Sequence, residues 1–191
     1  MPARLASIVV LAGTMIFAGA IQAADNYRLD PAHSSAIFRI KHANTAYLYG
    51  RINNPDGTIT VDESDLTKST FNIQLQSKNV DTGNTNRDNQ LRSPDFFSAQ
   101  EFPTLSFKST AVKTAGANKL DVTGDLSIHG QTRPITVTLE RTGTTNAPPL
   151  GSRTGFEGTF NIKRSDFGMK TMLEAVGDEV QITISLEAAK Q

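Results

Sequence analysis

The sequence has 191 residues, 38% of them apolar, which is enough for one well-packed domain and short for two. Lys and Arg together number 19, as do Asp and Glu, so no net charge favours nucleic acid or an anionic membrane surface as a partner. Because the chain contains no cysteine, it can form neither a disulfide bond nor a lipoprotein anchor, and packing and backbone pairing must hold the fold.

The first 23 residues have the order of a secretory signal peptide: Arg4, an apolar stretch over residues 8–18, and a run of small residues that ends at Ala23. We expect cleavage after Ala23, export to the periplasm or secretion, and a mature domain of residues 24–191 without an integral membrane segment. The alternative, an uncleaved anchor, would offer only residues 5–21, interrupted by polar positions, where a membrane span needs about 20 residues.

Apolar and polar residues alternate with a period of two along most of the mature chain, which predicts strands with one buried face. The predicted inward sets, in chain order, are Ala36, Phe38, Ile40 and His42; Phe71, Ile73 and Leu75; Leu105 and Phe107; Leu120, Val122, Leu126 and Ile128; Ile135, Val137 and Leu139; Phe156, Phe160 and Ile162; and Val180, Ile182, Ile184 and Leu186. Residues 142–155 are polar and contain two prolines, so we expect a connection there.

Turn residues separate these strands, as in the Pro55, Asp56, Gly57 run and at Gly130. The spacing predicts an all-β fold: a single extended antiparallel β-barrel of about eight strands, with one or two short helices at its mouth. Closure into a barrel explains one apolar face on every strand and removes exposed edges. An immunoglobulin-like sandwich is the alternative, although the chain lacks the Cys and Trp residues typical of it.

An insertion interrupts the strand pattern in the middle of the chain. Its residues 84–92 are expected to form about two helical turns, in which Asp88 and Arg92 lie four apart and could pair. A solvated surface helix would explain these charges but not the adjacent Phe96 and Phe97, which would plug the barrel end or line an apolar opening.

A second insertion lies near the C-terminus. Met169, Leu173 and Val176 recur there at helical spacing, which predicts a short helix. Methionine side chains are flexible and suit a wall that adapts to different ligands. This segment is therefore a candidate for part of the wall or entrance of a binding site.

The interior of a barrel of this size can be filled by side chains or can hold one small ligand. Many inward candidates are phenylalanine, which favours a filled core, whereas a lipid chain would need an apolar tunnel; the alternation leaves both open. With a filled core, the protein would be an exported, stress-related or partner-binding barrel that acts through its surface.

The histidines give no signal for a metal or a catalytic site. His33, His42 and His129 lack the paired spacing of a zinc site. Asp30, His33 and Ser34 could be imagined as a hydrolase triad, but the G-x-S-x-G turn of such enzymes does not occur. His42 is either a buried histidine bonded to the backbone or a contact for a ligand head group. We expect no catalytic residues, no metal and no cofactor.

Four stretches of the chain resemble successive blocks of the YceI-like family of exported bacterial proteins. They are "YRLDPAHSSAIFRIKHA", "VDTGNTNRDNQLRSPDFFSAQEFPTLSFKST", "VTGDLSIHGQTRPITVTL" and "RTGFEGTFNIKRSDFGM". The resemblance runs in family order from Tyr27 to Leu186. It implies an extended, lipocalin-like barrel with a tunnel for a polyisoprenoid or other long-chain amphiphile. One departure is Gln90, which stands where the family pattern has histidine and could not titrate near neutral pH.

The resemblance makes a non-catalytic carrier or sequestering protein for such a lipid the favoured function. The expected apolar tunnel residues are Phe38, Ile40, Phe71, Ile73, Phe96, Phe97, Phe107, Phe160, Phe167 and Met169. The expected head-group residues are Arg87, Arg92 and His42, with Asp88 orienting one of the arginines. The expected partner is one isoprenoid or other long-chain lipid, without nucleic acid, and a homodimer is an open option.

Overall fold

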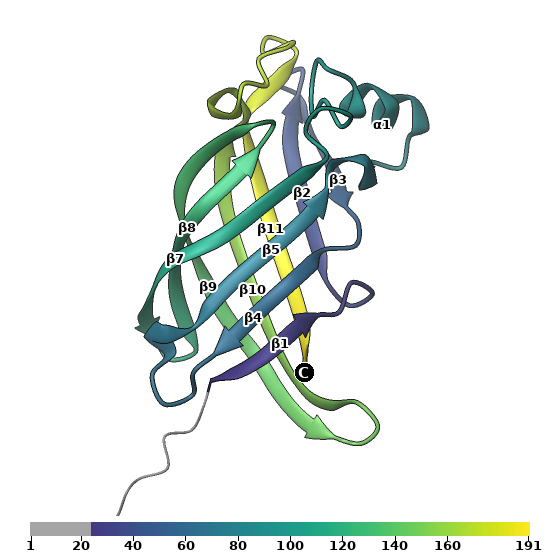
Figure 1. The fold of residues 1–191 in the computed structure, drawn as a ribbon. Coiled ribbons are helices and arrows are strands. Elements are labelled where there is room, and N and C mark those ends of the chain that lie inside the picture. Colours follow the sequence, from purple (N-terminus) through teal and green to yellow (C-terminus); the bar gives the residue numbers. More distant parts are fainter. Residues whose placement is uncertain (1–23) are drawn as a thin grey trace, which may run out of the picture.

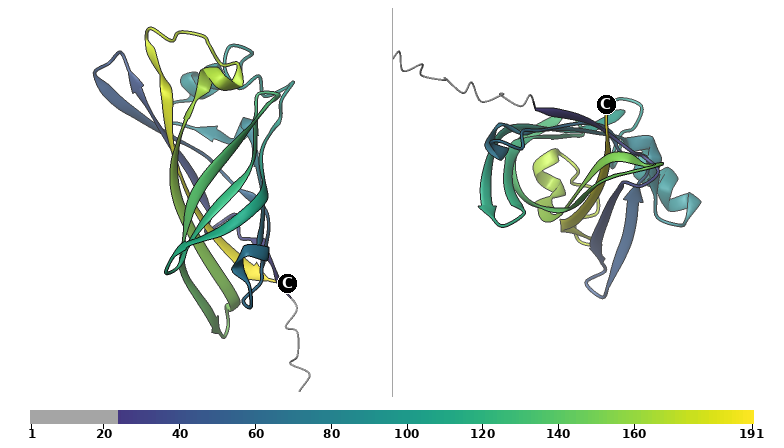
Figure 2. Two further views of the ribbon diagram at one scale, coloured as in Figure 1. Left: turned by 90° about the vertical axis from the view of Figure 1, so that its left-hand side faces the viewer. Right: turned by 90° about the horizontal axis from the view of Figure 1, so that it is seen from below.

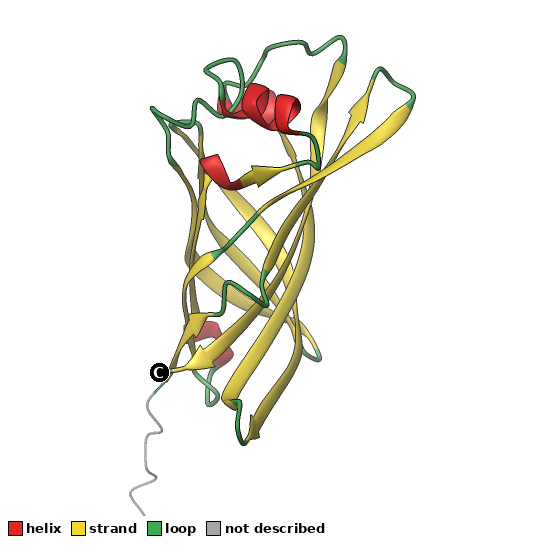
Figure 3. Cartoon of the chain, turned by 90° about the vertical axis from the view of Figure 1, so that its right-hand side faces the viewer, coloured by secondary structure: helices red, strands yellow, loops and turns green. Residues whose placement is uncertain are grey.

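The computed structural model describes residues 24–191, which form eleven strands, one α-helix and three short 3-10 helices (Figures 1 and 3). The strands are β1 (Asp25–Leu29), β2 (Ser35–His42), β3 (Ala46–Ile52), β4 (Asp56–Val61), β5 (Thr70–Gln76), β6 (Val80–Asp81), β7 (Thr104–Gly116), β8 (Lys119–Ile128), β9 (Gln131–Ala147), β10 (Gly151–Lys163) and β11 (Val176–Lys190). The helices are α1 (Thr85–Arg92), η1 (Leu66–Lys68), η2 (Ser77–Asn79) and η3 (Arg164–Phe167). The predicted signal peptide, residues 1–23, lies outside the described residues.

Eight of these strands close into an antiparallel barrel. Their order is β1-β4-β5-β7-β8-β9-β10-β11, and β1 pairs back onto β11, with Tyr27 opposite Lys190 and Leu29 opposite Ala188. The predicted barrel of about eight strands is therefore confirmed. Two separate packed sheets, as in the sandwich alternative, would not give this closure. No helix within residues 24–191 is long and apolar enough to cross a membrane.

The barrel wall divides into two halves along β11. The end of β11 pairs with β1, whereas its beginning pairs with β2, from Val176 opposite His42 to Ser185 opposite Ser35. β3 pairs with β2, and β6 pairs with β3, so in the upper half these three strands continue the wall from β11. The tip of the β2–β3 hairpin points away from the rest of the barrel, at the end where α1 and the segment of residues 164–175 lie (Figures 1 and 2). We call this end of the barrel the mouth.

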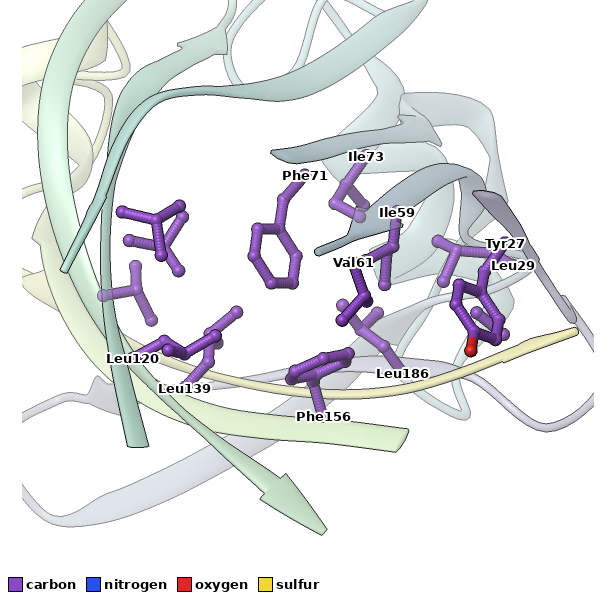
Figure 4. Packing of buried hydrophobic residues seen from close by; sticks show 14 residues of the cluster. Tyr27, Leu29, Ile59, Val61, Phe71, Ile73, Leu120, Leu139, Phe156 and Leu186 are labelled. Carbon is purple, nitrogen blue, oxygen red and sulfur yellow. The ribbon is translucent and has the colours of Figure 1, made fainter. Parts of the chain in front are cut away.

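The alternation predicted from the sequence corresponds to the inside of the barrel. The lower half holds a cluster of fully buried side chains, in which the rings of Phe71 and Phe156 meet edge to face at 5.2 Å between centroids (Figure 4). A second apolar cluster lies in the upper half and includes Leu105, Leu126 and Phe167. The half-buried Phe107 and Phe160 contact both clusters.

Two elements differ from the sequence-based predictions. The spacing of Met169, Leu173 and Val176 does not produce a helix: η3 ends at Phe167, where Gly168 with a φ of 83° caps it, and β11 begins at Val176. The predicted connection over residues 142–155 is instead a long hairpin, because β9 continues to Ala147 and β10 begins at Gly151. Its threonine-rich strands extend past the core, so neither face needs the apolar residues that mark the other strands (Figure 1).

An ion-pair cluster stabilises the seam where β1 meets β11. Arg153 Nη1 donates to Asp30 Oδ2 at 2.8 Å and to Glu187 Oε1 at 2.6 Å, and His33 Nδ1 lies 2.9 Å from Asp30 Oδ2. Potential metal-ligand atoms of Asp30, His33 and Glu187 lie within 4.8 Å of one another, but the guanidinium of Arg153 already pairs with both carboxylates. The hydrogen bonds from Arg153 and then His33 hold the pKa of Asp30 well below its usual range.

The depressed pKa of Asp30 predicts a stability that depends on pH. Its contribution is complete above the unfolded-state pKa of about 4 and is lost as the pH falls towards the lower folded-state pKa. We therefore expect Asp30→Asn to be less stable than the wild type at pH 7 and to lose less stability between about pH 5 and pH 3. Urea denaturation at a series of pH values measures this. Parallel pH profiles for the two proteins would contradict it.

Candidate functional site: a hollow upper barrel

The upper half of the barrel encloses an apolar cavity of about 280 Å³ that opens at the mouth. Its wall includes nine of the ten predicted tunnel residues: Phe38, Ile40, Phe71, Ile73, Phe96, Phe97, Phe107, Phe160 and Met169. The tenth, Phe167, is buried in the upper cluster beside the cavity and outside its wall. His129 Nδ1 donates to the Phe167 carbonyl oxygen at 3.1 Å and fixes the segment there. Phe167 as a tunnel residue stays a prediction.

Glycines on neighbouring strands explain why the inward phenylalanines leave this space open. Phe38 on β2 pairs with Gly50 on β3, and a Cβ atom at Gly50 would lie 2.4 Å from Phe38 Cζ. The ring of Phe107 covers Gly124 in the same way, since a Cβ atom there would lie 2.6 Å from Phe107 Cζ. Each ring thus fills the space that the glycine leaves without a side chain, and it lies against the barrel wall instead of projecting into the cavity.

Helix α1 positions the polar groups at the mouth. Asn84 caps the helix, because its side-chain oxygen accepts from the Arg87 backbone N–H at 3.1 Å. The predicted helix over residues 84–92 is therefore confirmed. Arg87 and Gln90 line the cavity, and Gln90 Nε2 lies 4.0 Å from the Met172 sulfur on the opposite segment of the rim.

Asp88 orients Arg87 through a threonine. The buried Asp88 Oδ1 accepts from the Thr82 hydroxyl at 2.6 Å and from the Thr82 backbone N–H at 2.8 Å. Arg87 Nε in turn donates to the Thr82 hydroxyl at 2.7 Å, and Arg87 Nη2 donates to the Thr82 carbonyl at 2.8 Å. No hydrogen bond from Arg87 Nη1 to another described residue is found, so this nitrogen is available at the mouth.

Arg92 has a different environment from Arg87. Its guanidinium donates to the carbonyl oxygens of Lys78 and Val80, both at 2.8 Å, and to Asn89 Oδ1 at 3.0 Å. These bonds tie α1 to η2 and β6, and Arg92 does not line the cavity. The expected pairing of Asp88 with Arg92 is absent among residues 24–191, because Thr82 takes the carboxylate instead. Arg92 as a head-group donor stays a prediction, and its geometry is that of a helix anchor.

His42 lies at the end of β2, where it lines the cavity and is exposed to solvent. Of the two interpretations of His42 from the sequence, a buried histidine bonded to the backbone therefore does not apply. Its place on the rim is compatible with a contact to a ligand head group, which stays a prediction.

Arg164 is a mouth residue that the sequence analysis did not identify. It is only 3% exposed, lines the cavity, and donates to the backbone carbonyls of Gly177, Met169, Thr171 and Val176 at 2.8–2.9 Å. Burial lowers the pKa of its guanidinium, and Asp178 acts in the opposite direction. A signal was present, because Arg164 continues the inward alternation of Phe160 and Ile162 into a position where a charge is unexpected.

These four hydrogen bonds also explain why residues 169–177 are not helical. A carbonyl that accepts from Arg164 points at the guanidinium and away from the axis of any local helix. The segment therefore wraps around one buried cation. This arrangement presents Met169 and Met172 to the cavity.

Comparison with known proteins places this barrel in a family. Residues 27–188, nearly all of the described chain, match the model of the YceI-like domain. The chain belongs to the YceI-like family. Among its YceI-like relatives are protein YceI of Escherichia coli, 39% identical over 185 residues, and a UPF0312 protein of Pseudomonas aeruginosa, 37% identical over 185 residues. Each alignment covers 96% of this chain and 96% of the relative.

Solved structures show the same YceI-like barrel. BcnA of Burkholderia cenocepacia superimposes with a TM-score of 0.77 at 27% identity, over 84% of this chain and 99% of that one. The YceI protein of Campylobacter jejuni gives a TM-score of 0.70 at 26% identity, over 79% and 89% of the two chains. A polyisoprenoid binding domain from Saccharophagus degradans gives 0.69 at 15% identity, over 86% and 98%, a likeness that concerns the fold alone.

Proposed function

We propose that this protein is an exported, non-catalytic carrier or sequestering protein that binds a polyisoprenoid or similar long-chain amphiphile inside its barrel. The observation that carries the proposal is the apolar cavity of about 280 Å³, whose polar side chains gather at the mouth. This is the arrangement that an amphiphile needs, with its chain inside and its head at the opening. Membership of the YceI-like family supports it.

Burial of the chain would dominate the affinity. Each buried methylene contributes about 0.8 kcal/mol, so one isoprene unit contributes about 4 kcal/mol before the costs of association. Contacts at the mouth would then set orientation and selectivity more than affinity. The alternative of a filled core that acts through its surface does not account for a cavity with this lining.

Extraction of bound lipid from natively purified protein tests the proposal. We expect organic extracts of the mature protein to contain a long-chain amphiphile, identified by mass spectrometry, and the stripped protein to bind such compounds again. Repeated extraction without lipid, together with no binding of any long-chain probe, would overturn the proposal. Cell fractionation tests export separately, with the mature protein expected in the periplasm or the medium.

The free Nη1 of Arg87 predicts a preference for an acidic head group. A charged hydrogen bond contributes about 1.5–3 kcal/mol. We expect Arg87→Ala to reduce the ratio of palmitate to palmityl alcohol affinity about tenfold, with a loss of stability of about 1 kcal/mol from the bonds to Thr82. Titration calorimetry with the two ligands measures the ratio.

Arg92→Ala is the matched control for Arg87→Ala, since both arginines belong to α1 and only Arg87 lines the cavity. Removing Arg92 leaves the carbonyls of Lys78 and Val80 without this donor, so stability should fall while the affinity ratio stays the same. Equal ratios for the wild type and Arg87→Ala would show that Arg87 is structural.

A further inference from the structure

The cavity wall has a definite lower limit on several strands. On β11 its wall extends down to Leu186 and stops before Ala188; on β8 it stops at Val122 before Leu120; and on β10 it stops above Phe156. On β5 the lowest wall residue is Phe71, and on β9 it is Leu139. We call Phe71, Val122, Leu139 and Leu186 the floor.

The floor rests on a solid layer. Phe71 and Phe156 are each 1% exposed, and their rings meet edge to face with an interplanar angle of 86°. Figure 4 shows the Phe71 ring facing, from the opposite side of the interior, the wall that carries Leu139, Phe156 and Leu186. Phe156 itself does not line the cavity, and its ring lies against the Phe71 ring. Because such interiors are close-packed, a chain that reaches this ring cannot pass without displacing it.

The depth above the floor is limited. On β11 the wall includes Val176 and alternate residues from Val180 to Leu186, about 33 Å of strand, which is about 25 Å along the barrel axis at the usual strand tilt. A cavity of about 280 Å³ is also at the small end of ligand sites, which range from about 300 to 1,000 Å³.

We propose that Phe71, supported by Phe156, is a stop that sets the greatest chain length the barrel accepts. The ligands are then single-chain amphiphiles of limited length, and a longer polyisoprenoid is bound only by the part of its chain nearest the head. Phe71 is a specificity-determining residue in this proposal, which rests on the proposed lipid-binding function.

A series of saturated fatty acids from decanoate to docosanoate tests the stop. For the wild type we expect affinity to rise about fourfold with each added methylene, equivalent to about 0.8 kcal/mol, up to a break beyond which it is flat or falls. In Phe71→Ala the break should move to longer chains by several carbon atoms. Ile135→Phe, which adds bulk to the wall above the floor, should move the break to shorter chains.

Phe97→Ala is the control, because Phe97 lines the cavity next to α1, where its backbone N–H bonds to the Leu91 carbonyl. It should change affinity without moving the break. If Phe71→Ala does not fold, Phe71→Leu and Ile135→Phe carry the test. The proposed stop would be overturned if the affinity of the wild-type protein rose with chain length without a break. It would also be overturned if the folded floor variants showed the break at the same chain length as the wild type. A wild type that binds none of the acids would overturn the proposed function itself.

Discussion

Replacing Arg164 by methionine is expected to lower the free energy of unfolding by about 3 kcal/mol and the melting temperature by about 10 °C. The reason is that one buried guanidinium satisfies four backbone carbonyls of residues 169–177, and methionine satisfies none of them. Buried polar groups left without a partner are among the costliest defects in a folded protein. Thermal and urea denaturation measure the loss.

The loss should be accompanied by a local effect on the mouth. Residues 169–177 are held around Arg164, so in the variant this segment should become sensitive to limited proteolysis before the barrel unfolds. Lysine at the same position keeps the charge but offers three donors from a single atom, so it should restore only part of the stability.

Arg133→Met is the matched control for Arg164→Met. Arg133 is exposed, and its Nη1 donates to the carbonyl of the neighbouring Thr132 at 2.9 Å. Its replacement should change stability by no more than about 0.5 kcal/mol. Equal melting temperatures for Arg164→Met, Arg133→Met and the wild type would show that the carbonyls around Arg164 are satisfied by other means.

Replacing Gly50 by alanine is expected to narrow the cavity from inside. The new Cβ atom would lie 2.4 Å from Phe38 Cζ and 2.8 Å from Thr82 Cγ2, so the Phe38 ring must move, and the open space beside it is the cavity that it lines. Overpacking of this kind costs about 1–3 kcal/mol. Loss of room for two methylenes would reduce the affinity for a long-chain acid by about 1.6 kcal/mol, or more than tenfold.

A second substitution separates the two effects. Gly50→Ala combined with Phe38→Leu returns space to the cavity, so the double variant should bind more tightly than Gly50→Ala alone, a coupling that a double-mutant cycle quantifies. Gly143→Ala is the control, because a Cβ atom at Gly143 meets no other atom within 4 Å. If Gly50→Ala bound the long-chain acid with wild-type affinity, the Phe38 ring would have moved without narrowing the cavity.

The short-range features of the fold were predictable from the sequence. Alternation identified the inward residues on the barrel strands, and the polar stretch after Asn84 indicated the helix that became α1. Such patterns depend on neighbours a few residues apart. The same local logic failed for Met169, Leu173 and Val176, because hydrogen bonds from the buried side chain of Arg164 to the backbone override their helical spacing.

The hollow interior and the geometry of the mouth required the tertiary structure. The sequence by itself determined that the barrel is lined with phenylalanine and that arginines gather in one insertion. Only the pairing of strands decided that Phe38 lies over Gly50 and Phe107 over Gly124. These large inward rings therefore line the cavity instead of filling it. Only the packing of α1 and of η3 decided that Arg87 and Arg164 face the cavity while Arg92 does not. The physical reason is that strand register and helix packing join residues far apart in the chain, and a period of two carries no information about which partner lies opposite.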